Sequence, residues 1–98
     1  MATELYLFGR FHVKAGHEAD VEKALCEVVA RTQRQRGCKE IQGYRSSRDP
    51  QLYYIHSRWT DETAFELHAA MPHTTRFLDL VQKLVDQPIE VSRTEQIT

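Results

Sequence analysis

Hydrophobic residues in this chain recur at two different intervals, and the order of these intervals limits its fold more than any other feature. The two-residue interval typical of strands occurs in four segments, residues 5–13, 41–47, 52–59 and 89–97. The interval of about 3.6 residues typical of helices fills most of 18–36 and 61–87, with a break at Met71-Pro72. The resulting order, β-α-β-β-α-β, is the ferredoxin-like pattern, in which helices cover one face of a four-stranded antiparallel sheet. The sequence therefore predicts a single α+β domain over residues 1–98.

The first predicted helix has the clearest pattern. Its apolar stripe recurs at helical spacing and consists of Val21, Ala24, Leu25, Val28 and Thr32. Acidic residues gather near its start and arginines near its end, which complements the helix dipole. We expect Gly37 to end this helix, because glycine takes the left-handed conformation without a clash of its Cβ.

The remaining elements follow from similar local signals. Residues 48–51, Arg-Asp-Pro-Gln, predict the turn of a hairpin. Thr60 or Asp61 is placed to cap the next helix by accepting hydrogen bonds from its free N–H groups. The residues predicted to face inward from the second, broken helix are Ala64, Phe65, His68 and Ala69, then Phe77, Leu80, Val81 and Leu84.

Composition excludes several classes of function. The net charge of −1, from 13 basic and 14 acidic residues, gives no electrostatic reason to expect a nucleic-acid or membrane partner. Two cysteines are too few for a disulfide framework. No segment approaches the roughly 20 apolar residues of a membrane span, and the N-terminus lacks the features of a signal peptide. We therefore expect a soluble cytoplasmic protein.

Motifs for common cofactors are also missing from the sequence. It contains no glycine-rich phosphate loop, dinucleotide fingerprint, CxxC pair or GxSxG elbow. His68 and His73 are five residues apart, which does not match the i,i+4 spacing of a helical metal clamp. The sequence thus predicts neither a cofactor nor a metal.

An ordered set of short motifs resembles the antibiotic biosynthesis monooxygenase family, which includes small quinol and anthrone monooxygenases. The motifs are Gly37-Cys38, Asp49-Pro50, Trp59, Ala64, His68, Pro72-His73 and Phe77. The resemblance implies a dimeric α+β barrel, in which two sheets pack face to face as a homodimer. It also implies a cofactor-independent monooxygenase that oxidises an electron-rich aromatic, such as a quinol, a catechol or an anthrone, with dioxygen.

Five residues are candidates for the site. His68 is the candidate base, because the family often has a histidine here beside its cavity and burial of a histidine favours the neutral form that a base requires. The family's corresponding tryptophan lines its cavity, so we expect Trp59, together with Phe65 and Phe77, in the walls of the substrate pocket, and His73 near the mouth. The structural alternatives are that Trp59, Phe65 and Phe77 are ordinary core aromatics and that His68 only satisfies a buried hydrogen bond.

Other features leave alternative functions open. Ser57, Ile55 and Phe65 stand where relatives often carry polar residues. A base beside an acidic C–H would also serve an isomerase of a small sugar-like ketone. The loss of polar positions favours a third class, a non-enzymatic dimeric module for ligand binding or stress response.

Overall fold

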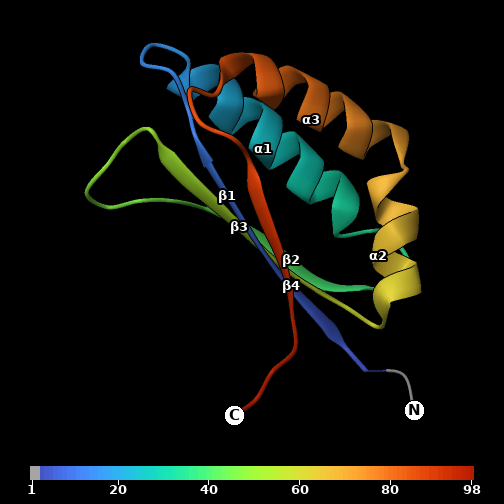
Figure 1. Cartoon of the computed structure of the whole chain (residues 1–98). Coiled ribbons are helices and arrows are strands. Elements are labelled where there is room, and N and C mark those ends of the chain that lie inside the picture. Colours follow the sequence, from blue (N-terminus) through green and yellow to red (C-terminus); the bar gives the residue numbers. More distant parts are fainter. Residues whose placement is uncertain (1–2) are drawn as a thin grey trace.

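The computed structural model describes residues 3–98 and has the predicted order of elements (Figure 1). These elements are β1 (Leu5–His12), α1 (Glu18–Thr32), β2 (Cys38–Arg45), β3 (Leu52–Trp59), α2 (Glu62–Ala69), α3 (Pro72–Leu84) and β4 (Glu90–Thr94). The second helix of the ferredoxin-like pattern is present as two pieces, α2 and α3, and the break falls at the predicted proline. Pro72 occupies the first turn of α3, where its missing N–H costs nothing.

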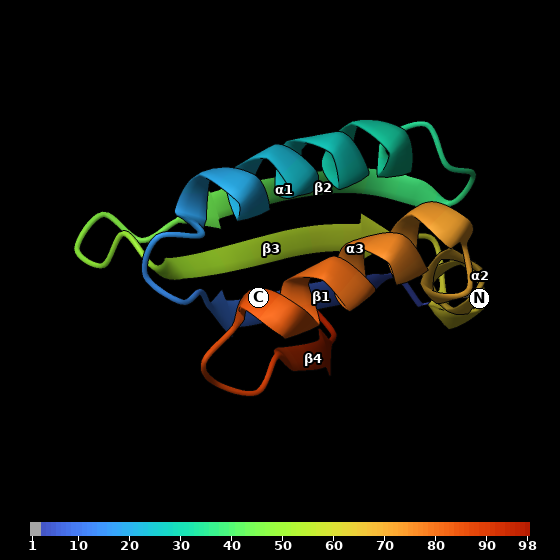
Figure 2. The ribbon, with the colours of Figure 1, turned by 90° about the horizontal axis from the view of Figure 1, so that it is seen from above.

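The sheet is antiparallel throughout, with strand order β2-β3-β1-β4. This order places the N-terminal strand between the hairpin and the last strand, which confirms the ferredoxin-like arrangement. Helices α1 and α3 lie over one face of the sheet, and α2 sits at one end of it (Figure 2). None of the helices in residues 3–98 has both the length and the hydrophobicity needed to span a membrane.

Short polar contacts set the boundaries of the hairpin and of α2. In the β2–β3 turn, the Asp49 carboxylate accepts a hydrogen bond of 2.9 Å from the Gln51 N–H. At the start of α2, the Asp61 carboxylate accepts one of 2.8 Å from the Ala64 N–H. Asp61, one of the two residues predicted to cap this helix, is therefore the cap of α2.

Gly37 does not end the first helix, so this prediction is wrong. Helix α1 ends at Thr32, and the chain makes a further turn before Gly37 adopts a φ of +88° ahead of β2. A Cβ on this glycine would lie 2.6 Å from the Cβ of Ala64. Glycine is needed here because the chain turns in the left-handed region while it packs directly against α2.

The inward-facing stripe of α2 and α3 is narrower than the sequence predicts. The buried residues of α3 are Thr74, Phe77 and Val81, whereas Leu80 is 41% exposed. Ala69, near the end of α2, is also exposed.

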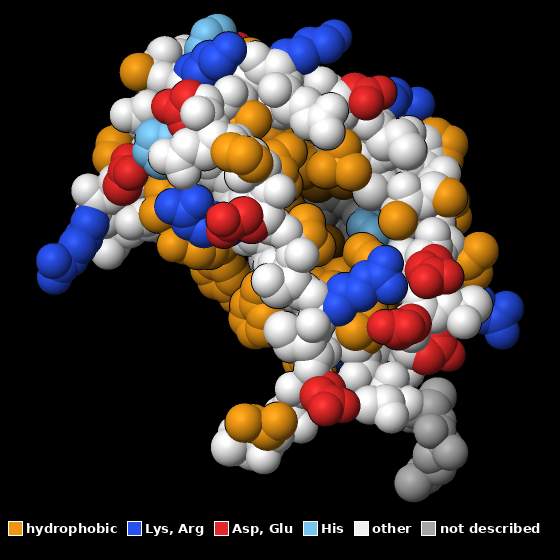
Figure 3. All heavy atoms as spheres, viewed as in Figure 1, with side chains coloured by type: hydrophobic (Ala, Val, Ile, Leu, Met, Phe, Trp, Pro, Cys, Tyr) orange, Lys and Arg blue, Asp and Glu red, His pale blue; other side chains and the backbone are white. Residues whose placement is uncertain are grey.

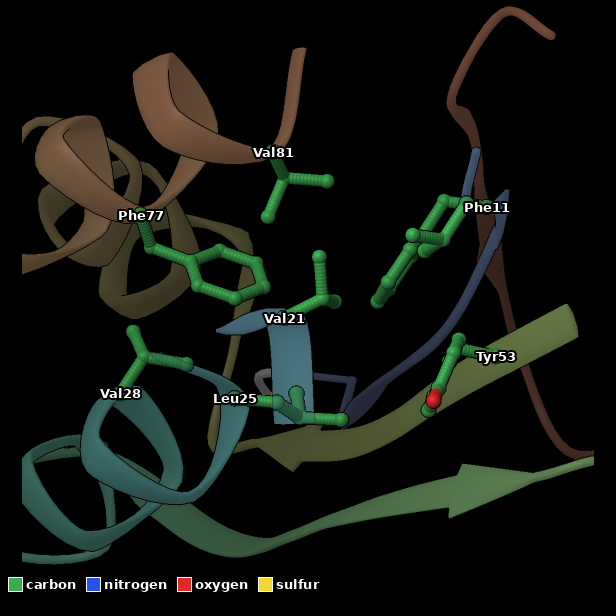
Figure 4. Packing of buried hydrophobic residues seen from close by; sticks show 8 residues of the cluster. Phe11, Val21, Leu25, Val28, Tyr53, Phe77 and Val81 are labelled. Carbon is green, nitrogen blue, oxygen red and sulfur yellow. The ribbon is translucent and has the colours of Figure 1, made fainter. Parts of the chain in front are cut away.

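Two groups of buried hydrophobic residues lie between the helices and the sheet. The larger group, here called the packed end, consists of Phe11, Val13, Val21, Leu25, Val28, Tyr53, Phe77 and Val81 (Figure 4). The smaller group, here called the Trp59 cluster, consists of Leu5, Leu7 and Trp59, with Cys38, Ala64 and Phe65 against it. The rings of Phe11 and Tyr53 stack at 5.7 Å in the packed end, and Phe77 meets Phe11 edge-on.

The opposite face of the sheet has no helix on it. It carries Phe8 and Tyr44, each 51% exposed, and Tyr54, which is 39% exposed. The Phe8 ring lies 5.1 Å from the ring of His56 on the neighbouring strand. Aromatic side chains therefore form a continuous part of this uncovered face.

Candidate functional site

A cavity of about 130 Å³ lies between the sheet and the helices, next to the Trp59 cluster. All three helices and all four strands contribute to its walls, which are mainly apolar. The lining includes Leu7, Ile55, Phe65, His68, Phe77 and Val91. Figure 3 shows a hollow on this side of the molecule, with hydrophobic side chains around it.

His68 is the titratable residue in the cavity wall. It lies on the inward face of α2 and is only 9% exposed. Its ring is 4.7 Å from the ring of Trp59 and 5.9 Å from that of Phe65, measured between centroids. The Asp61 cap and the close packing of Gly37 on Ala64 fix the start of α2, and thereby the position of this ring.

The two nitrogens of the His68 ring have different surroundings. Nδ1 lies 2.9 Å from Oε1 of Gln35 and 3.2 Å from Oγ1 of Thr74. Both hydrogen bonds of the His68 ring within residues 3–98 are made at Nδ1, and none involves Nε2. His68 lines the cavity, and Nδ1 is engaged by the protein, so Nε2 is the ring nitrogen left without a protein partner.

Burial, followed by the charge of the nearby His73, lowers the pKa of His68 to about 4. The charged imidazolium is disfavoured because it would lose its hydration without gaining an anionic partner. His68 is therefore neutral at pH 7, which is the state that can accept a proton.

Three hydroxyl groups add polar character to the apolar walls. Thr32 is fully buried and its Oγ1 has no hydrogen-bond partner within residues 3–98. Ser57 accepts a hydrogen bond of 3.0 Å from Nε1–H of Trp59. Thr74 contacts His68 as described above, so Thr32 carries the one hydroxyl of the three without a hydrogen-bond partner within residues 3–98.

The cavity's open side is bordered by β4 and α2. The guanidinium of Arg93 lies 5.1 Å from the centre of the Phe65 ring. Arg93 also forms ion pairs with Glu66 at 3.5 Å and with Glu62 at 3.8 Å. These exposed pairs contribute little stability, but they place a cation and two anions beside the cavity.

The structure brings together three of the five predicted site residues, because Phe65, His68 and Phe77 all line the cavity. Trp59 is completely buried behind His68 and is not part of the lining. His73 lies 5.9 Å from His68, yet it borders a groove between α1 and α3 together with Arg31 and Arg76. Burial, followed by the charges of these two arginines, lowers the pKa of His73. Substrate contacts of Trp59 and His73 stay predictions.

Sequence reasoning did not identify Gln35 or Thr32 as site residues. Thr32 appeared only as a member of the α1 stripe, and a threonine in such a stripe could have signalled a polar group in the cavity. Gln35 has no local signal, since its contact with His68 spans 33 positions of the chain. Residues 3–98 contain no group of three or more His, Cys, Asp or Glu side chains arranged to hold a metal ion.

Solved structures with this fold are numerous, and several resemble the chain along nearly its full length. PA3566 from Pseudomonas aeruginosa is 26% identical, with a TM-score of 0.90 over 100% of this chain and 98% of that one. Rv0793 from Mycobacterium tuberculosis is 18% identical, with a TM-score of 0.92 and coverage of 98% and 97%. SnoaB from Streptomyces nogalater, a cofactor-independent oxygenase solved in a mutant form, is 24% identical, with a TM-score of 0.87 and coverage of 99% and 96%.

Sequence comparison identifies the family more directly. A search of curated proteins finds no match to this sequence. The sequence profile of the antibiotic biosynthesis monooxygenase family, however, matches residues 5–85. This match includes every motif on which the resemblance was based, together with the cavity residues from α1, α2 and α3. The chain therefore belongs to the antibiotic biosynthesis monooxygenase family.

Proposed function

We propose that the protein is a cofactor-independent monooxygenase that oxidises an electron-rich aromatic with dioxygen, and that His68 is its base. The observation that carries this proposal is the neutral His68 ring in the wall of an apolar cavity, with Nε2 unpartnered. Family membership supports a monooxygenase role, and the fold is shared with SnoaB, an oxygenase that works without a cofactor.

The chemistry requires only a base and a site from which water is excluded. Nε2 of His68 removes a proton from the substrate, and the resulting anion is electron-rich enough to reduce dioxygen. A C–O bond forms at a carbon that bears hydrogen, and the imidazolium protonates the outer oxygen to give a hydroperoxide. Loss of the C–H proton and cleavage of the O–O bond then yield a carbonyl and water. One oxygen atom enters the product, and the substrate itself is the reductant.

The low pKa of His68 keeps the base neutral but also weakens it. A phenol with a pKa near 10 and an imidazolium with a pKa of about 4 differ by roughly 6, or about 8 kcal/mol. An imidazolium and a phenolate about 4 Å apart attract each other by roughly 4 kcal/mol at an effective dielectric constant of 20. The ion pair thus offsets about half the cost of proton transfer, and about 4 kcal/mol remains for turnover to overcome.

The size of the cavity narrows the choice of substrate. An apolar cavity of about 150 Å³ can hold benzene, whereas drug-sized ligands occupy roughly 300–1,000 Å³. The cavity of about 130 Å³ therefore matches a single ring, which favours a quinol or a catechol over a three-ring anthrone.

We also propose that the protein forms a homodimer through the uncovered face of the sheet. Phe8, Tyr44 and Tyr54 are exposed on this face, and burying them would remove apolar area from water. Light scattering at micromolar concentration should give twice the mass of the chain. A monomer mass would contradict this part of the proposal without affecting the assignment of His68.

Oxygen uptake with a panel of quinols and catechols, without added flavin or metal, tests the function. The wild-type protein should consume oxygen, and His68→Phe should lower turnover by about 10²–10⁴-fold, the usual contribution of a positioned acid–base group. His17→Phe is the matched control, because His17 lies at the start of α1, outside the lining of the cavity.

The outcomes separate the competing functions. A destabilised but fully active His68→Phe variant would show that His68 is structural. Turnover of a ketone without oxygen uptake would indicate an isomerase. Binding of quinols without turnover would indicate a ligand-binding module, which the weakness of His68 as a base also favours.

A further inference from the structure

The backbone N–H and the backbone carbonyl of Gln35 both form hydrogen bonds, which hold this residue in place. It lies in the turn between α1 and β2, where its N–H donates a hydrogen bond of 2.9 Å to the carbonyl of Thr32. Its own carbonyl accepts one of 3.1 Å from the N–H of Cys38. The turn therefore presents the Gln35 amide to His68 in a fixed position, 2.9 Å from Nδ1.

The hydrogen bonds around Nδ1 distinguish between the two neutral forms of the His68 ring. If Nδ1 carries the proton, one N–H group donates to Oε1 of Gln35 and shares this bond with Oγ1 of Thr74. If Nδ1 is unprotonated, Oε1 of Gln35 faces a lone pair. Turning the amide would instead bring two donors, Gln35 and Thr74, to a single lone pair. The form with the proton on Nδ1 is favoured, because one N–H shared between two acceptors is a common arrangement. In the other form, two donors would compete for one lone pair.

We propose that Gln35 is a positioning residue that holds His68 with its proton on Nδ1, so that the lone pair of Nε2 faces the cavity. Its catalytic consequence rests on the proposed function, in which Nε2 is the base. Free imidazole side chains favour the opposite form, with the proton on Nε2. Gln35 therefore selects the less common tautomer, and without this selection Nε2 would present an N–H that cannot accept a proton from a substrate.

The side chains in contact with the His68 ring are neutral, so no charged contact fixes its tautomer. Trp59 from β3, Phe65 from α2 and Thr74 from α3 contact the ring, and none of them carries a charge. His73 is the titratable group whose charge acts on His68. The charges of Arg31 and Arg76, which border the groove between α1 and α3, lower the pKa of His73. Within residues 3–98, a carboxylate introduced at position 35 would thus be the first anion within hydrogen-bonding distance of the ring.

Nitrogen NMR of the His68 ring tests the proposal without any substrate. In wild-type protein, Nδ1 should be protonated and Nε2 should show the shift of an unprotonated ring nitrogen. In Gln35→Leu, which removes the acceptor, a large fraction of the ring should move its proton to Nε2. Gln33→Leu is the matched control, since Gln33 is an exposed glutamine two positions away, and the wild-type tautomer should persist there.

A rescue variant separates positioning from a general structural effect. Gln35→Glu keeps an acceptor oxygen near Nδ1 and should restore the wild-type tautomer. Its negative charge favours the imidazolium, so the pKa of His68 should rise by roughly 1–3. In oxygen uptake, the acid limb of the pH–rate profile should shift to higher pH by the same amount. Gln35→Leu should lower turnover by roughly 10–100-fold, as loss of groups that orient working histidines in metal sites does.

Each outcome decides the proposal. A wild-type ring that carries its proton on Nε2, or a tautomer unchanged in a folded Gln35→Leu variant, would overturn it. If Gln35→Leu fails to fold, the wild-type tautomer and the shift of pKa in Gln35→Glu still decide the result. If no variant consumes oxygen but the tautomer responds as expected, the proposed function fails while the positioning role of Gln35 stands.

Discussion

The packed end and the cavity end of the helix-covered face differ in how they use similar side chains. At the packed end, Phe11, Val21 and Val81 fill the space between α1, α3 and the sheet. At the cavity end, Trp59 and Phe65 contact the His68 ring, and His68 also lines the cavity of about 130 Å³. Phe77 belongs to both regions, since it packs on Phe11 and also lines the cavity. The comparison indicates that one end mainly supplies stability, whereas the other gives up some packing to expose a neutral imidazole.

The pKa of a histidine is shifted in opposite directions at the two ends. At the packed end of β1, His12 lies between two carboxylates, with Nδ1 2.7 Å from Asp86 and Nε2 3.0 Å from Asp49. The hydrogen bond to Asp86 is the largest effect and raises the pKa of His12; burial opposes this rise, and the hydrogen bond to Asp49 adds to it. Burial without an anion lowers the pKa of His68. The partners available to each ring, rather than its residue type, therefore decide its charge.

Matched truncations at the two ends should have the largest effects. Phe11→Ala and Trp59→Ala should each lower the free energy of unfolding by about 3–5 kcal/mol, because both side chains are almost completely buried. Chemical denaturation, with dimerisation taken into account, measures these losses. Only Trp59→Ala should also weaken quinol binding at temperatures where the variant is folded, because Trp59 supports the His68 ring.

The matched pair gives a clear contrary result. A loss of stability below about 2 kcal/mol for Trp59→Ala would mean that the cavity end can relax around a missing indole. Equal loss of ligand binding in both variants would mean that the two ends do not divide stability and binding between them.

The pH dependence of stability should differ between wild-type protein and His68→Phe. The pKa of His68 is about 4 in the folded state and near 6.5 in the unfolded chain, so the unfolded state takes up the proton first. Above pH 6.5 the residue has no effect, and as the pH falls from 6.5 to 4 it should destabilise the fold by about 3 kcal/mol. Urea denaturation at pH 7 and pH 4.5 should show this loss in wild-type protein and a smaller one in His68→Phe. An identical loss in both proteins would show that His68 is not buried as a neutral group.

Replacement of the unpaired Thr32 hydroxyl should change the free energy of unfolding by a smaller amount. Thr32→Val keeps the shape of the side chain and removes a buried hydroxyl that has no partner, so it should raise stability by about 1 kcal/mol. Quinol binding should change little, because the hydroxyl has almost no accessible surface. Thermal denaturation and ligand titration measure stability and binding, and a loss of stability would show that the hydroxyl has a partner in solution.

The smallest expected change concerns His12 at the packed end. Its raised pKa means that the interaction with Asp49 and Asp86 is fully present below the unfolded value of 6.5 and is lost as the pH rises through the folded pKa. His12→Gln should therefore reduce stability more at pH 6 than at pH 9, the opposite direction to His68. Both carboxylates are solvent-accessible, so added salt should weaken the effect.

Much of the fold could be predicted from the sequence because its signals are local. The α1 stripe, the Asp61 cap and the break at Pro72 each depend on residues within a few positions of one another. The inward direction of His68 followed from the helical spacing of Phe65 and His68, and the cavity lining agrees with it. The family was evident from short motifs, and the match over residues 5–85 confirms it.

Tertiary structure alone decided how these elements meet. Gly37 has the left-handed conformation that glycine favours. Glycine is required at this position because the chain packs against Ala64 in α2, and not because α1 ends there. Leu80, His73 and Phe77 belong to the same helix and all border the groove between α1 and α3, yet only Phe77 also lines the cavity. The pairing of Gln35 with His68 joins a turn to a helix 33 positions away. Periodicity reports which side of an element is apolar, whereas these contacts depend on the distances between elements, which only close packing of the whole chain determines.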